Sequence, residues 1–399
     1  MKIKVVWLCQ FPLEELEEKI KFTQKPKSHP GSWILNLATE IARNENISLN
    51  ILTLTPHIYS DESCVYKNIN IFLIKSGIPY LNKGYPYFFR FDIFSGYIVE
   101  KRKLLNQIKV LNPDIIHIHG TESAYIRVLP MFKEKTIVSI QGVYSLFFEK
   151  SKKISDTLQK KFEKDVIKYA KNFGTRTHYD TNFVIGTNPK AKIIELNEAI
   201  SYNFFNKNWT YNPESISIVF VGSVIERKGV HILISAFSLV YKRYPKARLI
   251  IIGEIDLNYF NKLKSIILKE GIKDKVKFKG KLSSLEIATE LESSTVFVLP
   301  SFHENSPNSL AEAMAVGIPC VASNVGGIST MLDNGKNGLM FKSGDIHQLS
   351  KKLLSLLDNP SLMETISNNA KAWVKNRQYP PIVAEQTIET YKKIIYSNE

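Results

Sequence analysis

The sequence predicts an α/β protein with two doubly wound, Rossmann-like domains that face a cleft. Its 399 residues exceed what one hydrophobic core holds, since single cores stop growing near ~250–300 residues. Short apolar runs alternate with helical stretches, which is typical of parallel sheets covered by helices on both faces. The polar stretch Asn203–Ser215 interrupts this alternation once, so we expect two such sheets.

Apolar runs of the first half predict strands, and the longer stretches between them predict helices. The predicted strands are Lys4–Cys9, Asn50–Thr55, Asn70–Ile74, Asp114–His119 and Thr136–Ile140. The predicted helices are Ser32–Arg43 and Phe94–Leu111. This order predicts βαβ units.

The second half repeats the design. The predicted strands are Ile216–Val221, Ala247–Gly253, Lys275–Gly280, Val296–Pro300 and Pro319–Ala322. The predicted helices are Lys228–Tyr244, Tyr259–Glu270, Ser284–Glu292, Pro307–Val316, Ile346–Leu357 and, after two prolines, Ile382–Tyr396. We therefore expect domains over residues 1–205 and 206–380, with a C-terminal helix within 381–399.

The charge balance narrows the choice of partners. The chain has 53 Lys and Arg against 38 Asp and Glu, a net charge of +15, and residues 101–200 hold 18 basic and 10 acidic side chains. Such an excess suits an anionic membrane surface or a phosphorylated ligand, although a Lys-rich composition would also produce it. A nucleic acid partner is not expected, because the basic residues are spread and no reader motif is present.

The cysteines and the N-terminus indicate the compartment. Cys9, Cys64 and Cys320 form no C-x-x-C motif, which predicts a reducing environment. The first residues lack the long apolar stretch of a signal peptide, and no run of ~18 apolar residues could span a membrane. We expect a cytoplasmic protein that attaches peripherally to the inner face of the plasma membrane.

The segment Val296–Gly327 holds the most informative motif. After its strand, a helix is expected to begin with Ser306 as N-cap and Pro307 at the first helical position. The free amides of this helix end would be those of Asn308, Ser309 and Leu310. Such an end favours an anion such as phosphate.

Two glutamates accompany this helix. Glu304 lies in the loop before it, where a carboxylate can accept hydrogen bonds from hydroxyls or amides. Glu312 lies within the helix and could hold ribose hydroxyls. The alternative for Glu304 is a solvated loop residue without function.

The segment Val219–Val230 is a strand, a turn at Gly222-Ser223, and a basic pair, Arg227-Lys228, before a helix. A cation at a helix N-terminus opposes the helix dipole, unless a bound anion compensates it. Lys228 is therefore expected to supply a point charge to a diphosphate. The alternative is a solvated helix start.

Two further sites are expected in the first half. Strand alternation places His117 and His119 on one face, with His119 at the carboxyl end, although such a His is more often structural. Gly31 could let backbone approach a ligand, with Ser32 capping the next helix. No third metal ligand accompanies the histidines and no D-x-D occurs, so we expect no metal.

Two stretches could contact a membrane or an acceptor, or simply pack against the core. Tyr80–Tyr97 is dense in aromatic residues. Lys150–Phe173 predicts a basic amphipathic helix, with apolar positions at Ile154, Leu158, Phe162, Val166, Tyr169 and Phe173.

These motifs together resemble the retaining glycosyltransferases of family 4, which have the GT-B fold. The resemblance rests on the E-x(7)-E pair Glu304 and Glu312, the turn Gly222–Gly229 and the strand sequence PDIIHIHG. It covers nearly the whole chain and is most similar to enzymes of bacterial surface polysaccharide assembly. In such a fold the C-terminal helix packs back on the N-terminal domain.

The resemblance implies a role for each matching residue. Glu304 would hold the hydroxyls of the donor sugar, Glu312 the ribose, and His119 would face the sugar. Lys228 and the amides of Ser309 and Leu310 would bind the diphosphate. The remaining donor-side positions would be Gly31, Ser32, Gly222, Ser223, Arg227, Leu282 and Asn308.

This sequence departs from the family at two places. Ser223 stands where an Arg is usual, and Arg227 could replace that charge. Gln141 stands where a His often follows the next strand.

The leading hypothesis is transfer of a hexose, with retention, from a nucleotide diphosphate sugar to a saccharide or lipid-linked acceptor. The donor is a co-substrate, and no cofactor is expected. The alternatives are a sugar-nucleotide epimerase of the same fold and a non-catalytic sugar-nucleotide-binding protein.

Overall fold

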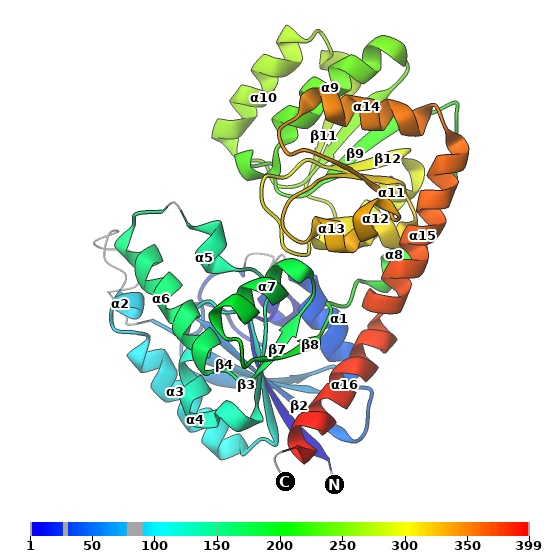
Figure 1. Cartoon of the computed structure of the whole chain (residues 1–399). Helices are drawn as coiled ribbons and strands as arrows, with labels where there is room; N and C mark the ends of the chain where they lie inside the picture. Colours follow the sequence, from blue (N-terminus) through cyan, green and yellow to red (C-terminus); the bar gives the residue numbers. More distant parts are fainter. Residues whose placement is uncertain (1, 27–30, 78–90, 150, 398–399) are drawn as a thin grey trace. The chain divides into compact units, whose positions relative to one another are not determined.

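The computed structural model describes residues 2–26, 31–77, 91–149 and 151–397 (Figure 1). The chain divides into two compact units. Unit 1 comprises Met1–Ala199 and Pro380–Glu399, and unit 2 comprises Ile200–Tyr379. Each unit is built around its own sheet, and together they confirm the expected pair of Rossmann-like sheets.

Unit 1 contains an eight-stranded sheet in the order β3-β4-β2-β1-β5-β6-β7-β8. All neighbouring strands are parallel except β3, which forms an antiparallel hairpin with β4. The strands are β1 Ile3–Leu8, β2 Ile47–Thr55, β3 Glu62–Tyr66, β4 Ile69–Lys75, β5 Ile115–His119, β6 Thr136–Ser139, β7 Asn172–Thr175 and β8 Lys192–Glu195. The chain order reverses between β1 and β5, where ligands bind in such sheets.

Helices cover both faces of this sheet. They are α1 Ser32–Ile41, α2 Phe91–Phe94, α3 Ile98–Leu111, α4 Leu129–Phe132, α5 Tyr144–Phe147, α6 Ile154–Tyr169, α7 His178–Thr187 and α16 Pro380–Tyr396. Helices α1 and α16 pack on one face, and α3 and α6 lie on the other (Figure 1). The core therefore consists of two apolar layers with the sheet between them.

The C-terminal helix packs back on the N-terminal unit, which confirms that expectation. Tyr391 of α16 is fully buried, and its hydroxyl accepts a hydrogen bond of 2.8 Å from Trp7 Nε1 in β1. The same hydroxyl lies 2.6 Å from Nδ1 of His117 in β5. This helix therefore reaches side chains of two central strands.

Unit 2 contains a six-stranded, fully parallel sheet in the order β11-β10-β9-β12-β13-β14. Its strands are β9 Ser217–Val221, β10 Arg248–Ile252, β11 Val276–Gly280, β12 Val296–Leu299, β13 Cys320–Ser323 and β14 Leu339–Phe341. Its helices are α8 Tyr202–Phe205, α9 Val230–Arg243, α10 Leu257–Lys269, α11 Ser284–Ser293, α12 Asn308–Val316, α13 Ile328–Met331, α14 Ile346–Leu357 and α15 Pro360–Gln378. One continuous apolar core joins these layers.

Some elements differ from the sequence-based expectations. The expected helix Phe94–Leu111 is divided into α2 and α3, because Gly96 and Tyr97 adopt positive φ angles of 66° and 60°. The expected helix Lys150–Phe173 is too long, since α6 ends at Tyr169 and Phe173 is buried in β7. Most of the aromatic run Tyr80–Tyr97 lies outside the described residues. Among the helices that the structure describes, none is long and apolar enough to cross a membrane.

Candidate active site

The phosphate-binding turn expected from the sequence follows β9 in unit 2. Gly222 leaves the strand with a φ of 152°, and its amide donates a 3.0 Å hydrogen bond to the carbonyl of Ile252. A single 3₁₀ turn, Glu226–Lys228, then precedes Gly229, from which α9 begins. Lys228 therefore stands just before the helix, whereas the sequence pattern placed it at the first helical position.

Glu304 is brought to this turn from the loop after β12. Nζ of Lys228 lies 2.5 Å from Oε1 of Glu304, and only 13% and 7% of the two side chains are exposed. Nη1 of Arg227 lies 3.8 Å from the same carboxylate and donates a 2.7 Å hydrogen bond to the carbonyl of His303. Two cations thus share one carboxylate, which leaves a net positive charge for an anionic ligand.

Two glycines allow these loops to approach each other. A Cβ atom on Gly229, whose φ is 67°, would lie 2.1 Å from the carbonyl oxygen of Pro300. A Cβ on Gly326, whose φ is 53°, would lie 1.7 Å from the carbonyl oxygen of Glu304. The amide of Phe302 also donates a 2.9 Å hydrogen bond to the carbonyl of Arg227. The Lys228–Glu304 pair is therefore held by close backbone contacts on both sides.

Gly229→Ala is expected to displace the Lys228 turn from the Glu304 loop and to lower turnover strongly. Gly271→Ala is the matched control, because Gly271 has the same φ of 67°, but a Cβ added there would meet no described atom within 4 Å. Both variants carry the same left-handed backbone strain of about 1–2 kcal/mol, so only the contact with Pro300 differs. Turnover and thermal unfolding of both proteins measure this. Equal losses of activity would show that the close approach is unimportant.

The helix that follows, α12, begins one residue later than expected. Its N-cap is Pro307 and not Ser306, and no side chain caps it. The amide of Leu310 donates a 3.1 Å hydrogen bond to the carbonyl of Pro307, which leaves the amides of Asn308 and Ser309 as the donors of this helix end. Oδ1 of Asn308 is buried without a partner among the residues that the structure describes. This end therefore has unused polar groups for a ligand.

The remaining donor-side positions have different environments. Burial raises the pKa of Glu312 to about 7. Hydroxyls of a bound ligand could offset this loss of solvation by donating hydrogen bonds to the carboxylate. Leu282 follows β11 and is partly buried against the core. Ser223 is exposed, whereas Arg227 contacts Glu304. Of these two, Arg227 brings charge to the site.

His119 lies in unit 1, at the end of β5, and stacks on His117 with ring centroids 3.8 Å apart. The hydroxyl of Tyr391 accepts from Trp7 and lies within hydrogen-bond distance of Nδ1 of His117, whose Nε2 lies 2.7 Å from Ser139 Oγ. Burial lowers the pKa of His117 to about 3, so its ring is neutral. His117, in the middle of β5, is thus structural.

His119 differs from its neighbour. Burial, and then the neighbouring His117, hold its pKa well below the usual value, so its ring is neutral. Both ring nitrogens are buried and have no hydrogen-bond partner in the described parts of the chain. Such groups are costly unless a ligand satisfies them. His119 is therefore better suited to bind a ligand than to stabilise the fold.

Sequence reasoning did not assign the polar residues around His119. Arg176 and Glu198 form an ion pair with side chains only 4% and 8% exposed, and Arg176 also donates to the carbonyl of Gln141. They line the small pocket that contains His119 and Ser139. Arg176 and Glu198 follow β7 and β8, and this position at strand ends could have identified them as site candidates. Those short strands were not predicted from the sequence.

The glycine-serine pair of unit 1 lies at the start of α1. Gly31 is the N-cap, with a φ of −95°, and Ser32 is the first helical residue, so the expected cap at Ser32 is wrong.

The described residues of the chain contain no group of three or more His, Cys, Asp or Glu that could hold a metal ion.

A family model described as glycosyl transferases group 1 matches residues 202–373, which is nearly all of unit 2. The glycosyltransferase MJ1178 of Methanocaldococcus jannaschii, itself uncharacterized, is 25% identical over 364 residues, covering 86% of this chain and 90% of that protein. Over residues 202–373 the chain therefore matches the group 1 glycosyltransferases. This family retains the configuration of the transferred sugar and uses nucleotide sugar donors.

Two other known proteins are similar to this chain. CapM, a capsular polysaccharide biosynthesis glycosyltransferase of Staphylococcus aureus, is 25% identical over 195 residues. That match covers 47% of this chain and spans about half of CapM, 48% of its length. The crystal structure of Anabaena HepE in complex with UDP and glucose has a TM-score of 0.71, 15% identity, and coverage of 98% of this chain and 99% of that one. The structural likeness confirms the GT-B fold.

Proposed function

We propose that this glycosyltransferase transfers a hexose from a nucleotide diphosphate sugar to a saccharide or lipid-linked saccharide, without a metal ion. The observation that carries the proposal is the Lys228–Glu304 pair, 2.5 Å apart and mostly buried, with Arg227 beside it. Cleavage of the donor leaves a diphosphate with growing negative charge. Preorganised cations and amides in a water-poor site stabilise such charge, which a metal ion does in other enzymes.

Each group then has a distinct task on the donor. Lys228, Arg227 and the amides of Asn308 and Ser309 neutralise the diphosphate. Glu304 accepts hydrogen bonds from hydroxyls of the sugar. Glu312 accepts from the ribose and His119 exchanges hydrogen bonds with the sugar, so the ligand satisfies groups that are desolvated in the free protein.

The domain roles follow the same proposal. The region 206–380 would bind the nucleotide sugar, the region 1–205 the acceptor, and the helix within 381–399 would complete the N-terminal unit. UDP and glucose occur in the HepE complex, and CapM is a capsular polysaccharide enzyme. These relatives support a UDP-sugar donor and a cytoplasmic role in cell-surface polysaccharide biosynthesis.

The test is turnover of a panel of nucleoside diphosphate hexoses by the intact chain, with EDTA present throughout. We expect release of nucleoside diphosphate from one donor at the same rate with and without EDTA, and formation of an α- or β-glycoside that keeps the donor's configuration. Activity lost in EDTA and restored by Mg²⁺ or Mn²⁺ would contradict the metal-free site. Release of a free epimerised sugar would favour the epimerase alternative.

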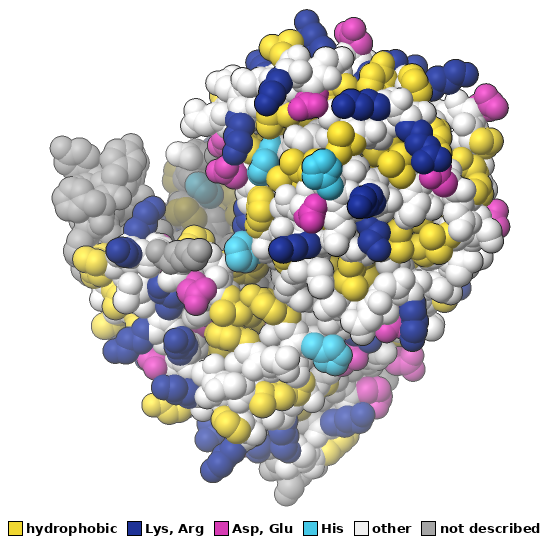
Figure 2. Space-filling view, turned by 45° about the horizontal axis from the view of Figure 1, so that its top comes forward, with side chains coloured by type: hydrophobic (Ala, Val, Ile, Leu, Met, Phe, Trp, Pro, Cys, Tyr) yellow, Lys and Arg dark blue, Asp and Glu magenta, His cyan; other side chains and the backbone are white. Residues whose placement is uncertain are grey.

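We also propose that helix α6 attaches the protein to anionic membranes. Lys161, Lys164 and Lys168 repeat at i, i+3 and i+7 on its exposed face, and the side chain of Ile154 at its start is 67% exposed. Over the face shown in Figure 2, basic side chains are scattered among neutral and hydrophobic ones. That scatter favours a local membrane contact over a nucleic acid groove.

Lys161→Glu with Lys168→Glu is expected to lower binding to phosphatidylserine vesicles more than about tenfold, since each lysine near such a surface contributes about 1 kcal/mol. Lys264→Glu with Lys269→Glu on the exposed face of α10 is the control, because it changes the net charge equally. Vesicle sedimentation at low and high salt measures both, and wild-type binding should weaken with salt. Equal losses in the two double variants would contradict a role for α6.

A further inference from the structure

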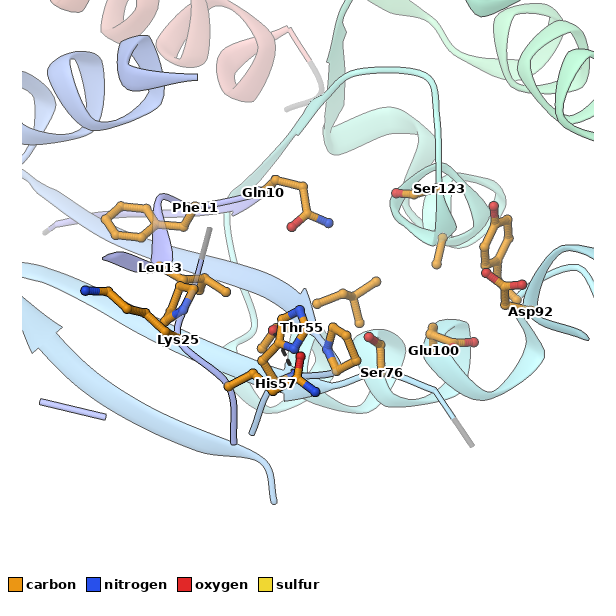
Figure 3. A pocket seen from close by; sticks show the side chains of 16 residues that line it. Gln10, Phe11, Leu13, Lys25, Thr55, His57, Ser76, Asp92, Glu100 and Ser123 are labelled. Atoms are coloured by element: carbon orange, nitrogen blue, oxygen red, sulfur yellow. Dashed lines mark hydrogen bonds between the residues drawn. The ribbon is translucent and has the colours of Figure 1, made fainter. Parts of the chain in front are cut away.

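The cavity shown in Figure 3 has no role in donor binding as described above. It has a volume of about 410 Å³, within the range of small-molecule sites, about 300–1,000 Å³. Its walls come from the ends of parallel strands: Gln10 follows β1, Thr55 ends β2, Ser76 follows β4, and Ser123 lies in the loop after β5. The cavity therefore spans the β1–β5 reversal point, where doubly wound sheets bind ligands.

Backbone strain is concentrated at this cavity. Among the described residues other than glycine, positive φ angles occur at Lys67, Asn68, Tyr97, Asn112, Ser123, Asp333 and Asn334. Lys67 and Asn68 form the hairpin turn between β3 and β4, and Asn or Asp tolerate such angles. The two that remain, Tyr97 and Ser123, both line the cavity.

Ser123 is the more strained of the two. Its φ of 71° and ψ of −168° lie in a region that is essentially restricted to glycine. Its hydroxyl oxygen is also buried, without a partner in the part of the chain that the structure describes. Strain of this kind, together with an unsatisfied polar group, persists at sites where it serves a ligand.

Tyr97 is fixed from two sides. Its amide donates a 2.6 Å hydrogen bond to the carbonyl of Asp92, and its hydroxyl donates to Gln159 Oε1 at 3.0 Å. This arrangement places Asp92 at the cavity wall, on the same side as Ser123 in Figure 3. The strained turn therefore brings a carboxylate to the lining of the cavity that also contains the Ser123 hydroxyl.

The charges of the cavity select against an anion. Asp92 and Glu100 are its acidic groups, and no arginine occurs among its described lining residues. Its lysine, Lys25, has a side chain that is 84% exposed, lies 3.9 Å from Glu17, and points away from Ser123 in Figure 3. Phosphate sites present cations or several amides, so this lining does not suit one.

The lining instead combines apolar and polar surface. Phe11, Leu54 and Pro56 contribute apolar area, whereas Gln10 and Ser76 add neutral hydrogen-bonding groups. A sugar ring has the matching chemistry, with apolar C–H faces and hydroxyls at its edge. Carboxylates and amide side chains are acceptors and donors for such hydroxyls.

We propose that this cavity binds the acceptor and that the bound part of the acceptor is an uncharged sugar ring, held by Ser123 and Asp92. This inference rests on the proposed transferase function and specifies its substrate class. It excludes an acceptor whose reacting end is a phosphorylated sugar or polyol.

The experiment uses calorimetry on the intact chain with uncharged methyl glycosides and disaccharides, each compared with a phosphorylated counterpart. We expect at least one uncharged glycoside to bind, and its phosphorylated counterpart to bind at least about tenfold more weakly. Stronger binding of the phosphorylated compounds, or no binding of any uncharged one, would overturn the inference.

Two substitutions test whether the glycoside binds in this cavity. Ser76→Trp should abolish glycoside binding by filling the cavity, whereas Ser63→Trp, on the exposed face of edge strand β3, should leave it unchanged. Ser123→Gly should raise the unfolding temperature by relieving strain, yet weaken the glycoside about tenfold by removing the hydroxyl. A more stable Ser123→Gly protein with unchanged glycoside affinity would show that Ser123 does not contact the sugar.

Nucleotide sugar affinity, measured on the same proteins, separates the two proposals. A chain that binds a nucleotide sugar but no glycoside overturns this inference and leaves the proposed function intact. A chain that binds glycosides in the cavity but no nucleotide sugar overturns the proposed function instead.

Discussion

Lys228→Ala is expected to lower kcat about 10²–10³-fold, the usual effect of removing one electrostatic stabiliser of a transition state. The free nucleoside diphosphate should also bind more weakly, because Nζ of Lys228 would no longer neutralise the diphosphate. The loss should exceed what Arg227 can replace, since the Arg227 guanidinium lies 3.8 Å from Glu304 and is held by the carbonyl of His303. Steady-state kinetics and calorimetry measure the two effects.

A structural explanation for this loss can be tested separately. Removing Lys228 leaves the buried Glu304 carboxylate with a weaker partner, which by itself destabilises a protein. The double variant Lys228→Ala/Glu304→Gln removes that unpaired charge, so it should regain stability but not activity. Recovery of turnover in the double variant would mean that Lys228 only neutralises Glu304.

Lys207→Ala provides a matched control in the same unit. Nζ of Lys207 lies 2.8 Å from Glu292, and the two side chains are 22% and 33% exposed. This pair has similar geometry but lies in a different part of the unit's sequence, so its loss should leave kcat within about twofold, as for most surface ion pairs. A comparable loss of turnover in Lys207→Ala would indicate a general effect on unit 2.

The sequence singled out the residues of the proposed donor site better than it predicted their geometry. Lys228 and Glu304 could be singled out because each stands beside a predicted strand and helix, where local patterns are informative. Their contact could not be read from the sequence, because it depends on the approach of Gly229 to Pro300 across 71 positions. Local patterns describe elements, whereas tertiary packing decides which loops meet.

The parts that were missed are short or depend on strain. Strands β7, β8 and β14 have four, four and three residues and were missed, whereas β6, β12 and β13, each of four residues, were predicted, so strands this short are detected only in part. Ser123 looks like any loop serine in the sequence, since its backbone conformation is imposed by the surrounding fold. The unsatisfied nitrogens of His119 likewise follow from what packs around the ring.

Glu304→Gln is expected to separate sugar binding from diphosphate binding. The amide keeps the shape of the carboxylate but loses its charge, so it holds the sugar hydroxyls less well as charge develops in the transition state. Turnover should fall about 10²-fold, comparable to the loss of one preorganised transition-state contact. Affinity for the free nucleoside diphosphate should stay nearly unchanged, because that ligand has no sugar for residue 304 to hold.

This pattern is opposite to that expected for Lys228→Ala, where binding of the free nucleoside diphosphate also weakens. Comparing calorimetry with the nucleoside diphosphate and with the intact donor therefore assigns each residue to its part of the ligand. Glu292→Gln, which alters the Lys207 ion pair in the same unit, controls for the loss of a carboxylate partner. If Glu304→Gln keeps wild-type turnover, the loop after β12 is not the catalytic site, and a sugar-nucleotide-binding protein without catalysis becomes the better explanation.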